Sequence, residues 1–272
     1  MDSRPIGIID AGMGGYTVVR QVQSMIPNED IIYYGDSFNQ PYGNRDKASI
    51  LHMARQILDF MKGQNVKLVA IACNTISTLL EEFRDDYPFP IFSIVEAGAQ
   101  AAVDSGSDKI GMISTVFTAN SGCYQQLIRK GKPQAIFVPK GCQDLPRLIE
   151  HGNFDQDELD LEVRKEVDAV FAVQDVSHLI LGCTHFGFVR KNIERFYPSL
   201  TVIDPAEEQG KRLKQFLEEN NMLTESGKGN FRVFTTGSPE RYREAAGRMT
   251  LYPPARVDAV SPPNPAPASS RV

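Results

Sequence analysis

The sequence predicts an α/β fold with two pseudo-symmetric parallel-sheet domains that face each other across a substrate cleft. Short apolar runs rich in Ile, Val and Leu alternate with longer amphipathic stretches, as expected for βα units whose parallel strands are covered on both faces. A weak internal repeat relates the first half of the chain to the second. The length of 272 residues is sufficient for two domains of ordinary size.

The apolar runs give the expected strands, in chain order Ile6–Asp10, Ile31–Tyr34, Leu68–Ala72, Ile91–Val95, Ile110–Ser114, Ala135–Val138, His178–Gly182, Thr201–Ile203 and Phe231–Thr235. The amphipathic stretches give the expected helices Tyr16–Met25, Lys47–Gln64, Ile76–Arg84, Asn120–Lys130, Glu158–Val173, Phe188–Phe196 and Glu207–Asn220, with a closing helix within 237–249. The segment 261–272 is rich in Pro, Ala and Ser and buries little apolar surface, so we expect a disordered tail there.

The internal repeat consists of two pairs of similar segments. IGIID at 6–10 resembles IGMIS at 110–114, and LVAIACNTI at 68–76 resembles HLILGCTHF at 178–186. The offsets of 104 and 110 residues keep the segments in the same order. If the two halves pack face to face, Cys73 and Cys183 become symmetry mates across the cleft.

Composition excludes several classes of partner. The formal net charge of −5 argues against nucleic acid or an anionic membrane, while a small anionic substrate is compatible with it. No apolar run approaches the roughly 18 residues that span a bilayer, and the N-terminus has no signal-peptide layout, so we expect a cytoplasmic protein. The four cysteines form no CxxC pair and the histidines show no metal-ligand spacing, which predicts free thiols and no metal site.

Cys73 and Cys183 each end an apolar strand, with a hydroxyl residue following near the start of an expected helix. A helix N-terminus attracts anions and lowers the pKa of a thiol. A single buried cysteine is usually a small core side chain, but two in equivalent positions of a repeat favour a function. Cys123 and Cys142 have no such setting, and we interpret them as structural.

Two thiols that face one cleft suit the inversion of a stereocentre, which requires a base on one face and an acid on the other. Cysteine has a reference pKa near ~8.5 that its neighbours can bring toward neutrality. One site would hold a thiolate while the other holds a thiol. Asp10, at the end of the first strand, and His185, two residues after Cys183, are suited to relay these protons.

Two loops follow the first strands. DAGMGG at 10–15 has neither the GxGxxG nor the GxxxxGK[ST] spacing of nucleotide-binding loops, so its glycines are expected to bring backbone N–H groups close to a small substrate. GDSFNQPYGNR at 35–45 is either an ordinary connection or a wall of the site.

With IGIIDAGMGGYTV, YYGDSFNQPYGNR, IACNT and LILGCTH in this order, the chain resembles the glutamate racemase branch of the aspartate/glutamate racemase superfamily from about Ile6 to Gly237. The resemblance implies a cofactor-free enzyme, usually a homodimer, that converts L-glutamate to D-glutamate for bacterial peptidoglycan. It also implies a discontinuous first domain, residues 1–97 plus 208–260, around a second domain of residues 98–207.

The resemblance also implies roles for individual residues. Cys73 and Cys183 are similar to the two acid/base cysteines, with Cys73 acting on the D form and Cys183 on the L form. Asp10 is similar to the carboxylate beside the first cysteine, His185 to the imidazole beside the second, and Glu150 to the acidic residue that supports this histidine. The substrate-holding positions are matched by Tyr42, Gly43, Asn74, Thr75 and Thr184.

The chain departs from the family pattern at several positions. Ala11 stands where the family has a serine whose hydroxyl helps to hold the substrate, and THFG at 184–187 replaces the usual THYP. The segment 141–152 also differs. These departures leave open the same chemistry on aspartate or another amino acid. A non-catalytic binding or regulatory homologue is a further alternative, although Asp10, both cysteines and His185 are all retained.

Overall fold

The computed structural model describes residues 1–151, 156–225 and 227–265. Within these ranges the strands form two sheets, and every strand pair is parallel. Sheet A has the order β10-β9-β2-β1-β3-β4 and consists of β1 (Ile6–Asp10), β2 (Ile31–Gly35), β3 (Leu68–Ile71), β4 (Ile91–Ser93), β9 (Phe231–Thr235) and β10 (Arg256–Ala259). Sheet B has the order β6-β5-β7-β8 and consists of β5 (Lys109–Thr115), β6 (Ile136–Cys142), β7 (His178–Gly182) and β8 (Thr201–Ile203).

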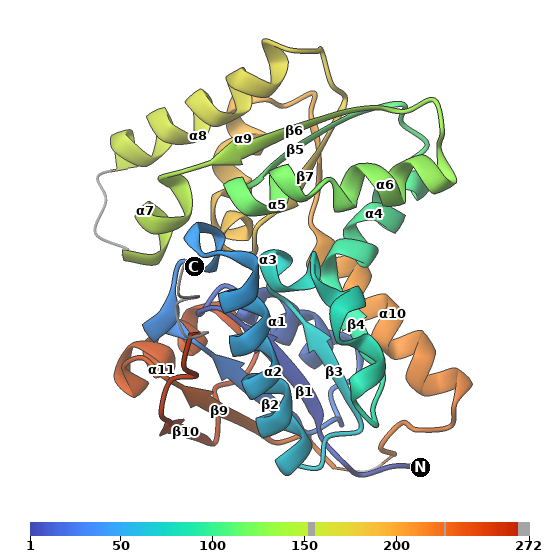
Figure 1. The fold of residues 1–272 in the computed structure, drawn as a ribbon, viewed down its shortest axis with the longest axis vertical. Coiled ribbons are helices and arrows are strands. Elements are labelled where there is room, and N and C mark those ends of the chain that lie inside the picture. Colours follow the sequence, from blue (N-terminus) through green and yellow to red (C-terminus); the bar gives the residue numbers. More distant parts are fainter. Residues whose placement is uncertain (152–155, 226, 266–272) are drawn as a thin grey trace, which may run out of the picture.

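The helices connect these strands and cover both sheets (Figure 1). They are α1 (Tyr16–Met25), α2 (Lys47–Gly63), α3 (Asn74–Ser77), α4 (Ile94–Asp104), α5 (Val116–Ser121), α6 (Cys123–Gly131), α7 (Leu145–His151), α8 (Gln156–Phe171), α9 (Arg190–Phe196), α10 (Pro205–Glu219) and α11 (Pro239–Met249). Figure 1 shows sheet A with its helices in the lower part of the molecule and sheet B with its helices in the upper part.

The two sheets share one topology. The order β2-β1-β3-β4 in sheet A is repeated as β6-β5-β7-β8 in sheet B. The register repeats as well: Ile6 of β1 lies opposite Leu68 of β3, and Ile110 of β5 lies opposite His178 of β7. These four residues begin the segments that the sequence repeat pairs with one another, so the repeat corresponds to a structural pseudo-symmetry.

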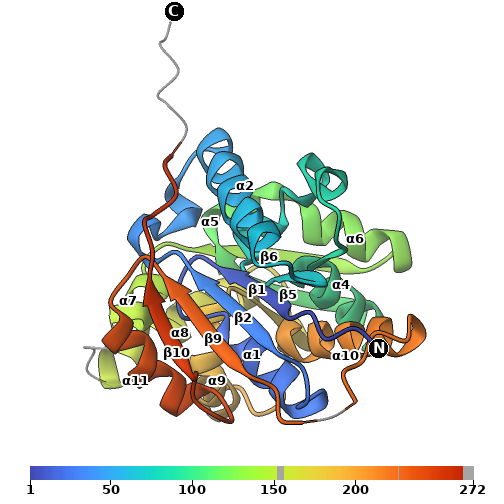
Figure 2. The same ribbon diagram turned by 90° about the horizontal axis from the view of Figure 1, so that it is seen from below.

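Successive residues of the strands point into different cores, because side chains alternate along a strand. In β1, Ile8 belongs to the core that contains α1 and α10, whereas Ile9 belongs to the core that contains α2. Figure 2 shows α2 over one face of sheet A and α1 and α11 on the other. The first core also contains Met112 of β5, so a continuous apolar interior joins the two halves.

Most expected elements are confirmed, and three of those whose extents differ from expectation do so for identifiable reasons. The strand expected over Ile91–Val95 ends at Ser93, whose Oγ accepts a hydrogen bond from Glu96 N (3.3 Å) and caps α4. The helix expected over Asn120–Lys130 is two helices separated by Gly122, which has φ +70°. The helix expected over Ile76–Arg84 is the single turn α3 followed by 3₁₀ turns.

The C-terminal segment is more ordered than expected. The short strand β10 was not predicted, and beyond it Asn39 Nδ2 donates to the Pro263 carbonyl (2.8 Å). Gln56 exchanges hydrogen bonds with the backbone of Asn264. The expected disorder from residue 261 is therefore wrong as far as residue 264, and 266–272 lie outside the described residues.

Candidate active site

A cavity of about 300 Å³ lies where the carboxyl ends of strands from both sheets meet. This is the edge at which open α/β sheets bind ligands. Ten of the eleven predicted site residues line it: Asp10, Ala11, Tyr42, Gly43, Cys73, Asn74, Thr75, Cys183, Thr184 and His185. The eleventh, Glu150, is the penultimate residue of α7, and its side chain is outside the described part of the structure.

Cys73 lies two residues after the end of β3 and Asp10 ends β1, and these strands are neighbours in sheet A. Burial raises the pKa of the Cys73 thiol, and the nearby Asp10 carboxylate raises it further. Backbone N–H groups of Ile76 and Thr75 lower the pKa by less. The expectation that a helix N-terminus lowers the pKa of this thiol is therefore wrong on balance: α3 is one turn long, and the loss of solvation outweighs its amides.

Cys183 occupies the equivalent position after β7 in sheet B. Its Sγ lies 3.7 Å from Nδ1 of His185, and both side chains are buried. An imidazole at this distance can exchange a proton with the thiol, whereas the ionisable neighbour of Cys73 in the first half is the Asp10 carboxylate. The two thiols therefore differ in their surroundings although their positions are equivalent.

Asp10 connects the two halves of the site. Its Oδ2 accepts hydrogen bonds from the backbone N–H groups of Gly12 (3.2 Å) and Gly15 (3.0 Å). The Thr184 hydroxyl, which belongs to the other half, lies 3.4 Å from Asp10 Oδ1 and 3.5 Å from Oδ2. The glycine-rich loop is thus used to hold a carboxylate of the protein itself.

Two glycines allow the halves to approach one another. A Cβ on Gly14 would lie 2.3 Å from Thr184 Oγ1, and a Cβ on Gly43 would lie 2.8 Å from the Cβ of Thr115. Real Cβ atoms do not come this close to other heavy atoms, so any larger residue would push the halves apart. At the second contact, Thr75 Oγ1 also lies 3.1 Å from Thr115 Oγ1.

Tyr42 lies in the wall of the cavity, but its hydroxyl donates to Asp36 Oδ2 at 2.6 Å. Burial, together with this carboxylate, raises the pKa of Tyr42 well above its usual value. The hydroxyl is therefore bonded to Asp36, and Tyr42 contributes to the site as part of the cavity wall. The loop 35–45 is a wall of the site, which decides between its two interpretations.

Of the departures from the family pattern, Ala11 lines the cavity but Phe186 does not. Phe186 is fully buried in the apolar core of the second half. A Cβ on Gly187 would lie 3.1 Å from Cγ2 of Thr17 and 3.6 Å from Oδ2 of Asp204. The THFG variation therefore changes the packing behind the site, whereas Ala11 changes its surface, as does the segment 141–152, which contributes Pro146 and Arg147 to the lining.

Sequence reasoning missed seven residues that line the cavity, namely Ser37, Gln40, Pro41, Thr115, Pro146, Arg147 and Arg241. The first three belong to the loop that was singled out as a possible wall. Thr115 ends β5, the strand equivalent to β1, so the repeat contained a signal for it. Arg147 and Arg241 come from α7 and α11, and no motif marked them.

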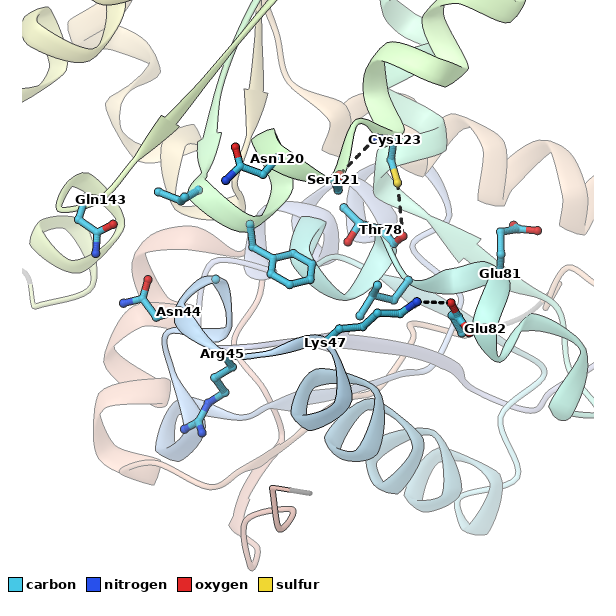
Figure 3. Close-up of a pocket in the computed structure, with 14 residues that line it drawn as sticks. Asn44, Arg45, Lys47, Thr78, Glu81, Glu82, Asn120, Ser121, Cys123 and Gln143 are labelled. Carbon is cyan, nitrogen blue, oxygen red and sulfur yellow. Dashed lines mark hydrogen bonds and ion pairs between the residues drawn. The ribbon is translucent and has the colours of Figure 1, made fainter. Parts of the chain in front are cut away.

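A second, larger cavity of about 890 Å³ lies beside the first and shares Gly43 with it (Figure 3). Figure 3 shows the ion pair of Lys47 with Glu82 on its lower wall and Cys123 on its upper wall. The Cys123 thiol donates to the Thr78 carbonyl at 3.3 Å. Apart from Gly43, none of the predicted site residues lines this cavity, so the candidate chemistry belongs to the smaller one.

All four cysteines are free thiols, as predicted, and Cys142 is buried in the core of the second half. No cluster of three His, Cys, Asp or Glu side chains with the arrangement of a metal site occurs in the described ranges. In the same part of the chain, no helix has the length and apolar character needed to cross a membrane.

Comparison with known proteins agrees with this geometry. The family model described as Asp/Glu/Hydantoin racemase matches residues 15–209. The chain is 38% identical over 245 residues to glutamate racemase 1 of Caldanaerobacter subterraneus, covering 89% of this chain and 91% of that protein. Its fold is similar to the crystal structure of Francisella tularensis glutamate racemase in complex with D-glutamate, with a TM-score of 0.88, 31% identity and coverage of 96% and 98% of the two chains.

A second solved structure, a glutamate racemase isoform from Bacillus anthracis, superposes with a TM-score of 0.91 at 28% identity and covers 97% of this chain and 99% of that one. The matches thus extend over both sheets and over the cavity between them. The chain belongs to the Asp/Glu/Hydantoin racemase family and is an amino-acid racemase.

Proposed function

We propose that this protein interconverts L- and D-glutamate by a two-base mechanism in which Cys73 and Cys183 act on opposite faces of the substrate, without a cofactor. The observation that carries the proposal is that two thiols, each at the carboxyl end of an equivalent strand of two pseudo-symmetric sheets, line one cavity from its two halves. A single-base enzyme has no need of the second thiol or of its matched position.

The surroundings of the two thiols support opposite starting protonation states. The raised pKa of Cys73 favours the protonated thiol, which is the form of an acid. Cys183 has an imidazole nitrogen within 3.7 Å that can accept its proton, which leaves a thiolate as the base. This arrangement is ready for the L-to-D direction, in which the family resemblance assigns the first proton transfer to Cys183.

In that direction the Cys183 thiolate takes the α-proton, the Cα–H bond breaks, and its electron pair is delocalised into the α-carboxylate. The Cys73 thiol then gives its proton to the opposite face of Cα. The reaction leaves Cys183 protonated and Cys73 as the thiolate. His185 and Asp10 are proposed to return protons to the starting arrangement, and Glu150 to support His185.

Recognition of glutamate is supported by the polar groups of the cavity. Two arginines, Arg147 and Arg241, lie among its lining residues and electrostatically favour an amino acid with two carboxylates. Asn74 has a buried Nδ2 without a hydrogen-bond partner within the described residues, which is a donor suited to a carboxylate. Thr75, Thr184 and the backbone at Gly43 complete the proposed substrate contacts, and Ala11 lacks the hydroxyl that the family uses.

Two relatives named as glutamate racemases and a homologous structure in complex with D-glutamate support the choice of glutamate. By the same family resemblance we propose that the protein acts as a homodimer in the cytoplasm and supplies D-glutamate for peptidoglycan. The same chemistry on aspartate or another amino acid is the second candidate, because Ala11 changes the surface of the cavity.

The test is to incubate the protein separately with L- and D-glutamate in D₂O without added cofactor. The α-hydrogen is followed by NMR and the handedness by optical rotation. Both signals are expected to decay from either enantiomer. If glutamate is left unchanged while aspartate is racemised, the second candidate is correct, and inertness toward a panel of amino acids would refute the two-thiol proposal.

A further inference from the structure

Tyr124, at the start of α6 in the second half of the molecule, reaches across to the first half. It is fully buried, and its hydroxyl donates to Oδ1 of Asn74 at 2.8 Å. Asn74 is itself 3% exposed and lines the smaller cavity. This hydrogen bond therefore connects a buried tyrosine of one half to a polar wall residue contributed by the other.

The bond favours one orientation of the Asn74 amide, because in this orientation the phenol proton has an acceptor. An asparagine side chain has an acceptor oxygen and a donor NH₂ group, and its orientation is determined by the hydrogen bonds that the two groups make. Here Oδ1 is occupied by Tyr124, whereas Nδ2 is buried and has no partner among the described residues. A buried donor without a partner is costly in free energy, so it is retained where a ligand satisfies it.

Tyr124 is kept as a donor by its environment. Burial raises its pKa, and the carboxylate of Asp204 and the thiol of Cys183 raise it further when charged. The phenol therefore stays protonated whichever thiol carries the proton during turnover. A protonated phenol directed at Asn74 favours the amide orientation in which the oxygen faces Tyr124.

The neighbouring backbone leaves room for this contact. Gly98 of α4 lies where a Cβ would be 2.7 Å from the Tyr124 hydroxyl oxygen and 2.8 Å from Cγ of Pro205. Any larger residue at position 98 would displace the hydroxyl from Asn74. Glycine at position 98 is therefore required for the Tyr124 hydroxyl to reach Asn74.

We propose that Tyr124 is a positioning residue that orients the Asn74 amide so that its Nδ2 donates to a carboxylate of the substrate. This role rests on the proposed function, in which Asn74 contacts glutamate. Without the phenol, the amide is free to turn its oxygen toward the substrate. The substrate carboxylate would then meet an acceptor instead of a donor.

The kinetic test is a double-mutant cycle of Tyr124→Phe and Asn74→Ala, with KM and kcat measured for both enantiomers of glutamate. Asn74→Ala is expected to raise KM by about 10- to 100-fold, because it removes a hydrogen bond to a charged group. Tyr124→Phe is expected to raise KM by about 3- to 30-fold with a smaller effect on kcat, and to add nothing in the Asn74→Ala background. An effect of Tyr124→Phe that multiplies with that of Asn74→Ala would overturn the positioning role.

Tyr16→Phe is the matched control. Tyr16 is also fully buried, but its hydroxyl donates to the backbone carbonyl of Tyr242 at 3.3 Å, away from Asn74. It is expected to leave KM unchanged. Gly98→Ala gives a second perturbation of the same contact, and we expect a rise in KM that also disappears in the Asn74→Ala background.

A measurement without turnover separates this role from the proposed function. In protein labelled with nitrogen-15 at asparagine, the Asn74 side-chain NH₂ signals are identified by their loss in Asn74→Ala. Tyr124→Phe is expected to shift them and Tyr16→Phe to leave them in place, even if glutamate proves not to be the substrate. Unshifted signals in Tyr124→Phe would overturn the positioning role, whereas inactive wild-type protein with shifted signals would refute the proposed function alone.

Discussion

Thr184 of one half lies with its hydroxyl 3.4 Å and 3.5 Å from the two carboxylate oxygens of Asp10 of the other half. Thr184 follows Cys183 in the chain, and Asp10 raises the pKa of Cys73. This contact therefore connects the surroundings of one thiol to the surroundings of the other. It also means that the position of the Asp10 carboxylate depends on how closely the halves approach.

Replacing Thr184 by valine removes the hydroxyl while keeping the branched shape. The hydrogen bonds to Asp10 are long and account for about 0.5–1.5 kcal/mol, and the proposed substrate contact of the same hydroxyl adds to this, so we expect kcat/KM to fall by at least about 2-fold for both enantiomers. Steady-state kinetics in both directions provide the measurement. Thr201→Val, at the exposed start of β8, is the control and should leave kcat/KM unchanged. Equal kinetics for wild type and Thr184→Val would show that the contact has no role.

Gly14→Ala tests the close approach of the two halves. Its Cβ would lie 2.3 Å from Thr184 Oγ1 and 3.1 Å from the backbone nitrogen of His185. Relief of this overlap must move the loop or the half that carries Cys183, at a cost of about 1–3 kcal/mol. We expect kcat to fall by at least about 10-fold, because the reacting groups lose their geometry.

Gly63→Ala is the control for this substitution. Gly63 ends α2 and has no atoms within 4 Å of a Cβ built on it. The alanine should stabilise the protein by up to about 1 kcal/mol, without an effect on kcat. A Gly14→Ala variant with wild-type kcat would contradict the assignment of this contact to the site.

Ala11→Ser restores the hydroxyl that the family has in the wall of the cavity. If glutamate is the substrate, one added hydrogen bond to a carboxylate should improve binding by about 1.5–3 kcal/mol when the geometry is favourable. We therefore expect a decrease in KM for glutamate of about 10-fold or more, measured for both enantiomers. No gain with glutamate, combined with a loss of activity on another amino acid, would show that the cavity is adapted to that other substrate.

The raised pKa values of two thiols predict a pH dependence of stability. Burial raises the pKa of both Cys73 and Cys142 above the ordinary value of 9.0. Above pH 9 the unfolded chain releases these protons while the folded protein keeps them. The unfolded state then binds fewer protons, so the free energy of unfolding falls as the pH rises.

Urea unfolding at a series of pH values from 7 to 10 measures this effect. We expect the contribution of these two thiols to the free energy of unfolding to be constant below about pH 8.5 and to decline above it. Cys142→Ser should have a shallower decline than wild type, because one of the two thiols is then absent. An identical slope in the variant would show that the Cys142 thiol titrates normally in the folded protein.

Much of the fold follows from the pattern of the sequence. The strands are short runs of β-branched and apolar residues, and because they are buried on both faces, the runs are continuous and easily recognised. The repeated segments that begin at Leu68 and His178 also indicated the equivalence of the two cysteines, and β3 and β7 do occupy equivalent positions in their sheets. The edge strand β10 was missed because only Val257 of its four residues is buried.

The apolar periodicity of the sequence failed to predict element boundaries where a single residue ends or starts a helix. Gly122 divides α5 from α6 within a stretch whose apolar spacing continues, and Ser93 starts α4 inside an apolar run that reads as one strand. The tail up to Asn264 is held by hydrogen bonds to Asn39 and Gln56, which no composition argument detects.

The residues of the candidate site that belong to sequence motifs could be predicted, and those outside the motifs could not. Asp10, Cys73 and Cys183 could be predicted because each lies at the carboxyl end of a recognisable strand. Arg147 and Arg241 lie on α7 and α11, and their place at the cavity depends on how these helices pack in the folded protein. The raised pKa of Cys73 could not be predicted from the sequence either, because it depends on how completely the folded protein excludes water from this thiol.

The central claim is that two different thiols move the two protons. It is tested most directly by converting L-glutamate in D₂O and measuring deuterium at Cα in the product and in the remaining substrate at low conversion. The two-thiol account predicts D-glutamate that carries deuterium from its first formation, with residual L-glutamate that retains protium. Product that keeps the original protium, or deuterium entering the residual L-glutamate as fast as product forms, would indicate one base serving both faces and would contradict the account.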